Sequence, residues 1–484
     1  LLTFSRASGG TALRKISYGN ELVTNGTFDS DSGWTLNNAV ISNGVVSANN
    51  GTRFLAQDAG LVTGTLYKVT FGYTQGATHS SGSIRVNTNA FNGAGTQHNS
   101  SNFYNMDSSG SLTFIIVAEG PYIAIEAAFA PFSGTIDNIS VKEVLFDQAD
   151  GTLQVFNHGN NVPRIEYDAT GAVKGLLIEE ARTNLYLNSN QFVSPWSRIA
   201  SDIYASAGTS PSGLADAWRW VGTGNAILYQ NTSHVAGDYT VSAWVKSNGA
   251  GEDTFRLYGL NSLISGDFTA TSEWVRYSYT FTSAIVGSRF SGLLYGASQG
   301  NVDLLVYGLQ IEAGSFPTSY IPTTGAAATR ARDIAEIPTS AFGYNNDAGT
   351  VVCEFDSAAL YGSTIFTLDG AGSSNGITAI IYPANRISYQ VVTGGVTQVN
   401  SNFDAYATAS QVSKVATVYA KDDFAAVLNG GAVATDTAAS LPTVDLLRLG
   451  VYLGGALFIM SGHIKSIQYY PRRLTNTQLQ ELTT

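Results

Sequence analysis

The stretch GLQIEAGSFPTSYIPTTGAAATRARD, residues 308–333, contains three kinds of sequence in succession. An apolar, strand-like run is followed by a segment of Pro, Thr, Gly and Ala, and then by the charged sequence RARD. Pro317 and Pro322 cannot donate a hydrogen bond to a sheet, and each favours extended backbone in the residue before it. The stretch therefore predicts the last strand of one β domain, a semi-rigid strap and the start of another domain.

The strand that opens this stretch is predicted to cover LLVYGLQIEA, residues 304–313. Successive side chains of a strand point to opposite faces of its sheet. We therefore expect Leu305, Tyr307, Leu309 and Ile311 to face the same way, toward one core.

The charged end of the stretch resembles a second charged group in LLIEEARTNL, residues 176–185. Adjacent residues on a strand point to opposite faces, so only one of its two glutamates can face a given partner. A planar guanidinium can bridge carboxylates, and Glu166 and Asp168 are alternative partners for the arginines. The predicted structural joint between domains consists of Glu179, Glu180, Arg182, Arg330, Arg332 and Asp333.

The composition of the chain is that of an all-β protein. Among 484 residues only 13 % are charged, while Gly (51), Tyr (25) and Phe (23) are abundant. This mixture favours short strands joined by tight turns over long helices, which are rich in Glu, Lys, Leu and Ala. The length predicts about three or four domains of roughly 100–200 residues each.

Several classes of protein are excluded by charge and hydropathy. A net charge of −11 argues against a nucleic-acid partner, because binding to phosphate backbones needs basic patches. No run of about 18 apolar residues occurs, so we expect no membrane insertion. The single cysteine, Cys353, lies in the apolar run TVVCEF and is predicted to be a small buried hydrophobe.

Two regions of the chain share three segments in the same order. The pairs are NELVTNGTFDSDSGW (20–34) with TNLYLNSNQFVSPW (183–196), LYKVTFGYTQG (66–76) with DYTVSAWVKSNG (238–249), and TIDNISVKEV (135–144) with LLVYGLQIEAG (304–314). Each segment alternates apolar and polar residues, which is typical of half-buried strands. The repetition predicts two copies of one β module.

The segment between the copies is too short for a domain and too regular for a linker. Its natural partner is the N-terminal segment, so we expect the first copy to be inserted into a small hairpin platform. The predicted division is 1–19 and 145–182 for the platform, 20–144 for the inserted module, 183–328 for the second module and 329–484 for the last domain.

The last domain contains further strand signals and a short terminal helix. Asn429-Gly430 lies between two apolar runs, which predicts a tight hairpin. Thr475 and Gln478 have the spacing of a capping box, so LTNTQLQEL is predicted to begin a helix.

These motifs resemble a known arrangement. TFSRASGGTALRK (3–15), VPRIEYDATGAVKGLLIEEARTNL (162–185) and YGLQIEAGSFPTSYIPTTGAAATRARD (307–333) resemble segments of bacteriophage tail-fibre and spike proteins that frame a carbohydrate-binding-module-like jelly roll. The hairpin at Asn429-Gly430 and the ending GHIKSIQYYPRRLTNTQLQEL resemble concanavalin A-like, laminin G-like lectin domains. The resemblance implies an all-β fold of antiparallel β-sandwiches, two jelly rolls and a concanavalin A-like sandwich, on a β-hairpin platform.

The resemblance also implies a function. We expect a phage virion fibre or spike protein on the virion surface that binds a host-surface polysaccharide. Its expected partners are the host glycan, other virion structural proteins and further copies of the chain, with a trimer as the first choice. Two alternatives remain: a purely structural virion or capsid-attached fibre component, and a polysaccharide depolymerase.

An enzymatic role is not expected. Concanavalin A-like glycoside hydrolases place Glu, Asp and Glu at alternate positions of one strand, so that two carboxyl groups flank the scissile bond. Glu354 and Asp356 match the first two positions, but residues 358 and 359 are both alanine. The five histidines are not spaced as zinc ligands.

Aromatic residues are the candidates for sugar binding, because sugar rings pack on aromatic faces. Trp218 and Trp220, two residues apart on one strand, are predicted to form a platform. The other candidates are Trp244, Trp274, Tyr73 and Tyr104. Jelly-roll modules often carry a structural calcium ion, for which Glu21 and Asp137 of the first copy are candidate ligands; no other cofactor is expected.

Overall fold

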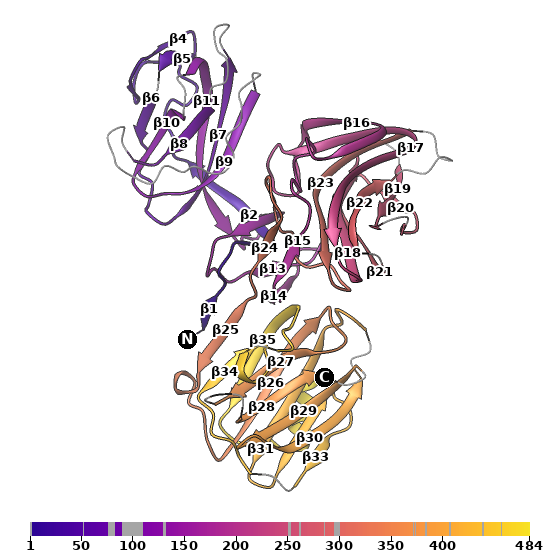
Figure 1. Ribbon diagram of the computed structural model, residues 1–484. Coiled ribbons are helices and arrows are strands. Elements are labelled where there is room, and N and C mark those ends of the chain that lie inside the picture. The colour runs from indigo at the N-terminus through magenta and orange to yellow at the C-terminus, as the bar shows by residue number, and fades with distance from the viewer. Residues whose placement is uncertain are drawn as a thin grey trace. The chain divides into compact units, whose positions relative to one another are not determined.

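The computed structural model is built almost entirely of antiparallel β-strands, which confirms the all-β prediction (Figure 1). It describes residues 2–484 except 52, 76–82, 90–109, 129–131, 250–252, 261–262, 285, 295–300, 371, 373, 383–384, 406–407, 438–439 and 456. The chain divides into two compact units. One unit is Lys15–Thr152, and the other comprises Leu1–Arg14 and Leu153–Thr484.

The unit Lys15–Thr152 is a sandwich that includes the predicted inserted module. One sheet has the order β3-β6-β10-β8, and in the other β11 pairs with β2, β5 and β7. Its strands are β2 (Gly10–Glu21), β3 (Thr35–Leu36), β4 (Ala39–Ser42), β5 (Val45–Gly51), β6 (Arg53–Asp58), β7 (Leu66–Gln75), β8 (Ser83–Asn87), β9 (Gly110–Val117), β10 (Tyr122–Ala128) and β11 (Phe132–Phe146). Lys142 of β11 pairs with Glu21 of β2, so the two ends of the module lie on adjacent strands.

The second jelly roll is one eight-stranded sheet that encloses its own core, with the order β20-β19-β22-β17-β23-β18-β21 and β16 beside β17. Its strands are β16 (Ser197–Gly208), β17 (Ala217–His234), β18 (Gly237–Ser247), β19 (Asp253–Tyr258), β20 (Phe268–Ala270), β21 (Val275–Ser283), β22 (Gly287–Leu294) and β23 (Asn301–Ala313).

The closing strand β23 does not alternate as predicted. Leu309 and Ile311 lie in the core, but Tyr307 packs in a separate cluster on the other face, and Leu304 and Val306 take the core positions instead. The reversal occurs at Gly308, whose φ of 62° lies in the left-handed region, and the pairing with β18 shifts register there. A β-bulge therefore divides the strand into two halves with opposite orientation.

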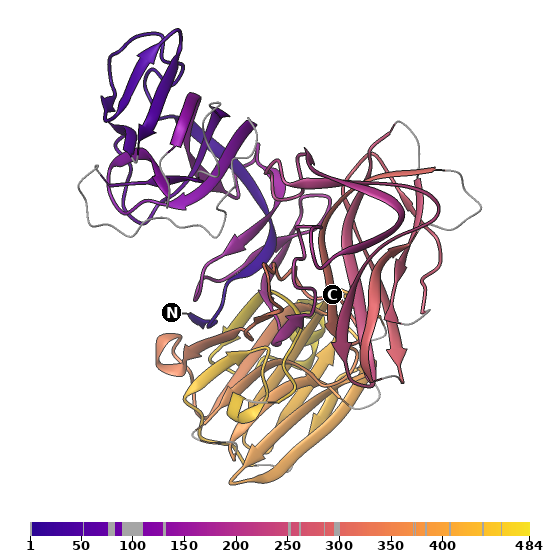
Figure 2. The same cartoon turned by 45° about the horizontal axis from the view of Figure 1, so that its top comes forward.

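The last sandwich consists of two seven-stranded sheets (Figure 2). The front sheet has the order β1-β25-β34-β27-β28-β29-β30, and the back sheet has the order β13-β14-β35-β26-β31-β32-β33. Front strands are β1 (Thr3–Ser5), β25 (Ile334–Pro338), β27 (Ser363–Asp369), β28 (Gly376–Ile381), β29 (Arg386–Thr393), β30 (Val396–Ala405) and β34 (Leu446–Leu449). Back strands are β13 (Ile165–Tyr167), β14 (Val173–Ile178), β26 (Ala348–Ser357), β31 (Ser413–Ala420), β32 (Phe424–Leu428), β33 (Ala434–Asp436) and β35 (Gly462–Tyr470).

The two predicted pieces of the platform contribute strands to more than one sheet: β2 lies beside β12 (Thr152–His158), and β1, β13 and β14 join the last sandwich. Strand β1 pairs with β25 at the edge of the front sheet, and the β13–β14 hairpin pairs through β14 with β35 at the edge of the back sheet. Two further short strands, β15 (Arg182–Asn184) and β24 (Ala328–Arg330), pair with each other. The N-terminal segments thus complete the last sandwich, as Figure 1 shows for β1 beside β25.

The local signals of the last domain are confirmed. Asn429 and Gly430 have φ of 48° and 67°, which a tight hairpin between β32 and β33 requires. Helix α1 (Asn476–Thr483) begins with the predicted capping box of Thr475 and Gln478. Cys353 is buried in the core. Two short 3-10 turns complete the described elements, η2 (Thr339–Ala341) and η3 (Leu453–Gly455). Among the described residues, no helix is long and apolar enough to cross a membrane.

Candidate functional site

Five buried side chains form the joint, and we keep that name for Arg6, Arg164, Glu179, Arg330 and Asp333. Arg164 donates to Glu179 over 2.8 Å and to Asp333 over 2.5 Å, so that it bridges two carboxylates. Arg6 contacts Asp333 at 3.0 Å, and Arg330 lies 3.4 Å from Glu179. The three arginines that pair with Glu179 and Asp333 come from the N-terminus, the segment just before β13 and β24, so the joint ties these segments together.

The electrostatics of the joint depend on complete pairing. Burial opposes the charged form of Glu179, but Arg330, Arg164 and hydrogen bonds from Ser319 outweigh it and hold its pKa well below the usual range. Burial lowers the pKa of Arg330, and Glu179 opposes this shift. Removing one partner would therefore leave an uncompensated charge without water around it.

The two adjacent glutamates lie in the loop between β14 and β15 and have different partners. Glu179 points into the joint, whereas Glu180 is half-buried and accepts a 2.9 Å hydrogen bond from Nε of Arg182. Asp333 lies in the joint, and Arg332 is half-buried beside it in the chain. Asp168, an alternative partner for the arginines, instead accepts hydrogen bonds from Thr170 and Ala172 within its own turn.

Two members of the joint were not singled out from the sequence. Arg6 occurs in TFSRAS, which has no acidic residue, and Arg164 occurs in VPRIEY, where Glu166 follows two residues later. Neither local pattern indicated that Glu179 and Asp333 would be the partners. The burial of the two arginines, at 1 % and 0 % exposure, is decided by segments more than 150 residues away in the chain.

A second buried group lies next to the joint, on the outer face of the back sheet. His463 of β35 contacts Asp356 of β26 through Nδ1 at 2.9 Å and Glu166 of β13 through Nε2 at 2.8 Å. Burial alone would lower the pKa of His463, but the two carboxylates outweigh burial and raise it. Both ring nitrogens therefore donate, and the imidazolium crosslinks three strands.

The two carboxylates that match the glycosidase pattern both have partners. Glu354 is paired with Lys465 at 2.8 Å, and Asp356 is held by His463. With both ring nitrogens engaged, His463 offers no nitrogen to act as a general base.

The predicted tryptophan platform is wrong for Trp220. This side chain is fully buried in the core of the second jelly roll, at 0 % exposure, because β17 turns that face inward. Trp218 is half-buried at the same core and contacts Phe192 edge to face, with ring centroids 5.7 Å apart. A platform on this face of the strand is not accessible to a sugar.

Trp244 and Trp274 have a structural role in the same unit. Both pack at a small cluster of Val155, Tyr307 and Tyr320, which joins β12 and the strap to the outer face of β23. The indole nitrogen of Trp274 also donates to the carbonyl of Thr209 at 3.0 Å. These two residues therefore pack in a cluster on the outer face of β23 and do not form an open aromatic surface.

The remaining sequence candidates lie in the other unit. Tyr73 is half-buried and packs against the core of that sandwich, while Tyr104 lies outside the described residues. Glu21 accepts hydrogen bonds from Ser140 (2.6 Å) and the Val141 backbone (2.7 Å), which pins β2 to β11.

Asp137, the other calcium candidate, accepts hydrogen bonds from the backbone and side chain of Asn138. Glu21 and Asp137 thus have separate partners. Within the described part of the chain, no group of three or more His, Cys, Asp or Glu side chains could hold a metal ion. Calcium binding by this unit stays a prediction.

The outer face of the front sheet carries a continuous row of polar side chains. Thr367, Thr378, Gln390 and Asn400 lie directly opposite one another on β27, β28, β29 and β30. Gln390 accepts a 2.8 Å hydrogen bond from the hydroxyl of Tyr452 and reaches toward Asn400 with its amide nitrogen, at 3.5 Å. Asn400 and Asn402 at the β30 edge are exposed.

A cluster of aromatic rings borders this row. Tyr361, which is 56 % exposed, lies 4.9 Å from Tyr382, and Tyr382 lies 5.4 Å from Phe458. Tyr382 follows β28 directly and therefore lies on the same outer face as Thr378. We call the row and this cluster together the polar face. It combines an exposed aromatic surface with amides that both donate and accept hydrogen bonds.

Part of the polar face is covered by the segment after β34. Thr367 donates to the carbonyl of Val451 at 3.0 Å, and the amide of Gly454 donates to Asp369 at 3.2 Å. Burial raises the pKa of Asp369, whose other carboxylate oxygen has no hydrogen-bond partner within the described part of the chain. Ser388 of β29 is also buried, so the exposed amides of this face are Asn400 and Asn402 at the β30 edge.

No protein-family model matches the chain, and no curated protein matches it. Among solved structures, it is similar to the CBM40 of Ruminococcus gnavus IT-sialidase, with 16 % identity and a TM-score of 0.26 over 28 % of this chain and 83 % of that one. It is also similar to the tandem CBM22 domains of Paenibacillus barcinonensis Xyn10C, with 8 % identity and a TM-score of 0.20 over 62 % of this chain and 99 % of that one.

A third similar structure is the LG4-5 region of the mouse laminin alpha1 chain, with 9 % identity and a TM-score of 0.22 over 60 % of this chain and 89 % of that one. Like the other two, it has a low TM-score, and none of the three likenesses carries an argument about what this chain binds. The all-β class of the chain follows from its own sheets.

Proposed function

We propose that this chain is a glycan-binding protein without catalytic activity, and that the polar face is its binding surface. The observation that carries the proposal is the exposed Tyr361 in an aromatic cluster that reaches the row of amides through Tyr452, whose ring lies 5.6 Å from that of Phe458 and whose hydroxyl donates to Gln390. An aromatic ring packs against the apolar face of a sugar, while amides pair with its hydroxyls in either direction. The engaged nitrogens of His463 support binding rather than hydrolysis.

The proposal extends to a biological setting: a fibre or spike on the surface of a phage virion that adsorbs to a host polysaccharide. The resemblance of residues 162–185 and 307–333 to such proteins supports it. The joint supports it as well, because buried ion pairs fix the orientation of the jelly roll against the last sandwich. Assembly into a homo-oligomer, with a trimer as the first choice, would raise avidity by linking weak sites.

The test is binding of the purified chain to a glycan array and to bacterial surface polysaccharides. We expect Tyr361→Ala to weaken binding about tenfold, since the loss of a stacked ring costs roughly 1 kcal/mol or more. The matched control is Tyr204→Ala, which removes a tyrosine of similar exposure (51 %) from the second jelly roll.

Three outcomes would contradict the proposal. Failure of the parent chain to bind any glycan would leave a purely structural virion component as the better description. Equal loss of binding in both tyrosine variants would move the site away from the polar face. Release of shortened sugars from the polysaccharide would make the protein a depolymerase.

A further inference from the structure

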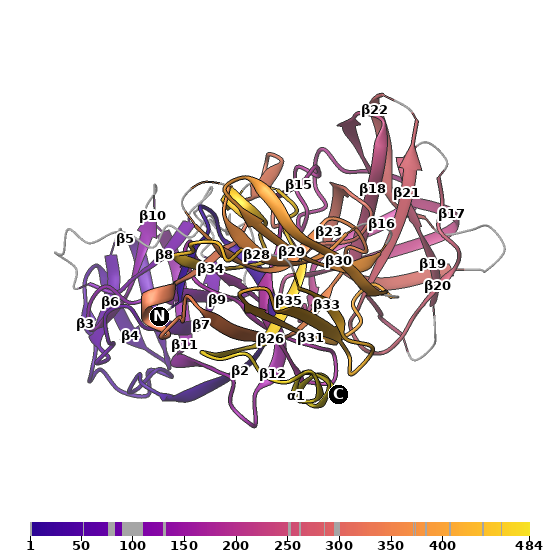
Figure 3. The same ribbon diagram turned by 90° about the horizontal axis from the view of Figure 1, so that it is seen from below.

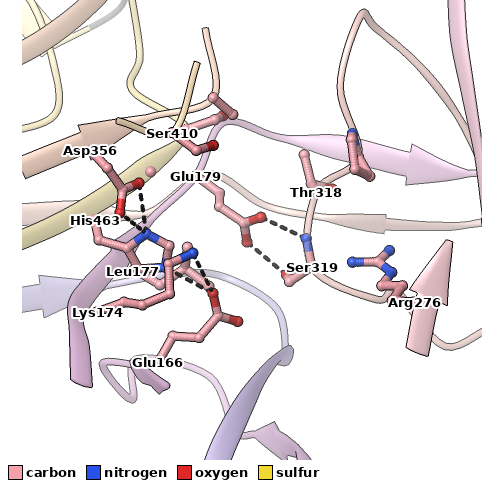
Figure 4. A pocket seen from close by; sticks show the side chains of 14 residues that line it. Glu166, Lys174, Leu177, Glu179, Arg276, Thr318, Ser319, Asp356, Ser410 and His463 are labelled. Carbon is pink, nitrogen blue, oxygen red and sulfur yellow. Dashed lines mark hydrogen bonds and ion pairs between the residues drawn. The ribbon is translucent and has the colours of Figure 1, made fainter. Parts of the chain in front are cut away.

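A small pocket lies between the second jelly roll and the last sandwich (Figure 4). Its volume is about 140 Å³, and Arg276, Thr318 and Ser319 of the jelly-roll side face Lys174 and His463 of the sandwich side. A water molecule takes about 30 Å³ in the liquid, so the pocket has room for roughly four or five waters or for one small polar solute.

The acidic side chains around this pocket already have partners. Glu179 accepts hydrogen bonds from the backbone and hydroxyl of Ser319 and from Arg164, and Asp356 is held by His463 (Figure 4). Glu166 contacts His463 at 2.8 Å and Lys174 at 3.8 Å. None of these carboxylates therefore needs a cation from solution.

Arg276 is in the opposite situation. Its Nη2 donates to Ser242 at 3.0 Å, but its buried Nε has no hydrogen-bond partner, and it makes no ion pair with any described residue. Burial lowers the pKa of Arg276, and the charge that opposes this shift most is Glu312, which accepts hydrogen bonds from Thr318 and Gln310. A planar guanidinium with free donors is the side chain that best matches a carboxylate.

The charge balance of the region points the same way. The acidic side chains are five: Glu166, Glu179, Glu312, Asp333 and Asp356. The basic ones are Arg6, Arg164, Lys174, Arg276, Arg330 and His463. All of these basic side chains except Arg276 contact a carboxylate, and Arg276 lines the pocket.

We infer that this pocket binds the carboxylate group of a small organic anion, held by Arg276 with Lys174 in support. Two sources can supply that chemistry: a free small carboxylate, or the carboxylate of an acidic sugar. The inference does not depend on the polar face, which lies on the other sheet of the sandwich.

The test uses the full chain, titrated with sodium acetate, sodium glucuronate or glucose against sodium chloride of equal ionic strength. We expect the melting temperature to rise saturably with glucuronate, with acetate or with both, and to stay unchanged with glucose, because a ligand that binds only the folded state stabilises it. A response to glucuronate alone identifies an acidic sugar as the source, and a response to acetate identifies a free carboxylate.

The variants Arg276→Gln and Lys174→Gln test the assignment of residues. Arg276→Gln is expected to abolish the response and Lys174→Gln to weaken it several-fold, whereas Arg198→Gln, an exposed arginine of β16, leaves it unchanged. If Arg276→Gln fails to fold, Arg276→Lys is the alternative variant. Lysine keeps the positive charge but lacks the two parallel N–H donors of a guanidinium, so we expect the carboxylate to bind at least tenfold more weakly. The inference is overturned if neither anion shifts the parent chain, or if the shift persists in Arg276→Gln.

Discussion

The two outer faces of the last sandwich are built from the same kind of strands but have opposite uses. On the back sheet, Val352, Ala416, Val418, Ala425 and Val427 form an apolar patch that α1 covers with Leu479, and Figure 3 shows α1 beside this sheet. On the front sheet, the corresponding positions of β29 and β30 are Ser388, Gln390, Asn400 and Asn402.

This difference in polarity determines which face is available to a partner. An apolar face must be covered, and here the helix covers one end while the His463 group occupies the other end, opposite the second jelly roll. A polar face satisfies its hydrogen bonds with water or with a ligand, so it can stay open. The back sheet therefore contributes stability and orientation, and the front sheet offers a surface.

The largest effect is expected from breaking the joint at the edge of the back sheet. Arg164→Ala leaves Glu179 and Asp333 without their shared partner, and we expect a loss of about 3–5 kcal/mol in the free energy of unfolding. The control Arg182→Ala removes the more exposed pair with Glu180, for which about 0–1 kcal/mol is expected. Denaturant unfolding followed by tryptophan fluorescence measures both, and equal losses would refute a buried joint.

The next effect is expected where α1 covers the back sheet. Leu479 is fully buried, so Leu479→Ala should cost about 2–5 kcal/mol through lost burial and the cavity left behind. Glu481→Ala, at an exposed position of the same helix, should change stability by less than about 0.5 kcal/mol. A small loss in Leu479→Ala would mean that the helix is not needed to cover this face.

The group of His463, Asp356 and Glu166 makes the stability of the back sheet depend on pH. The pKa of His463 is higher in the folded protein than in the unfolded chain. Its contribution to the free energy of unfolding is therefore complete below the ordinary histidine pKa, and it is lost as the pH rises through the pKa of the folded protein. The pKa of Glu166 is lowered, mainly by the His463 hydrogen bond against the cost of burial, so its contribution is lost as pH falls through that value.

Thermal unfolding across the range from about pH 4 to about pH 9 should therefore show a stability maximum between these two transitions. In His463→Gln the decline on the alkaline side should become shallower, because no imidazolium is left to deprotonate. An unchanged alkaline slope in this variant would assign the pH dependence to other groups.

The smallest effect on stability is expected on the polar face. The double variant Asn400→Ala, Asn402→Ala removes two exposed amides, and the free energy of unfolding should change by less than about 0.5 kcal/mol for each. Glycan binding, in contrast, should fall about tenfold or more, since each lost hydrogen bond costs roughly 1 kcal/mol. The exposed Asn301→Ala in β23 is the control that should change neither quantity.

Much of the fold could be predicted from local sequence. The apolar run TVVCEF predicted a buried Cys353, Asn429-Gly430 predicted the turn after β32, and Thr475 with Gln478 predicted the helix cap. These predictions held because an apolar run, a turn conformation and a helix cap each depend on residues within a few positions of one another.

The site was less predictable. Glu179 and Asp333 were singled out by their sequence, but Arg6 and Arg164, which pair with them, carried no local signal. Tryptophans suggested a sugar platform, yet Trp220 is in the core, and the exposed ring beside amides belongs to Tyr361. A residue type shows what a side chain can do, and only the packing around it shows whether a ligand can reach it.

Composition and local pattern were enough to predict that this chain is all-β and that a charged segment follows two prolines after β23. The packing of distant segments was needed to show that β23 reverses at Gly308, that β1 completes the front sheet, and that Arg276 lines a pocket without an ion pair. The reason is physical: burial and charge pairing depend on segments hundreds of residues apart, and no local pattern carries that information.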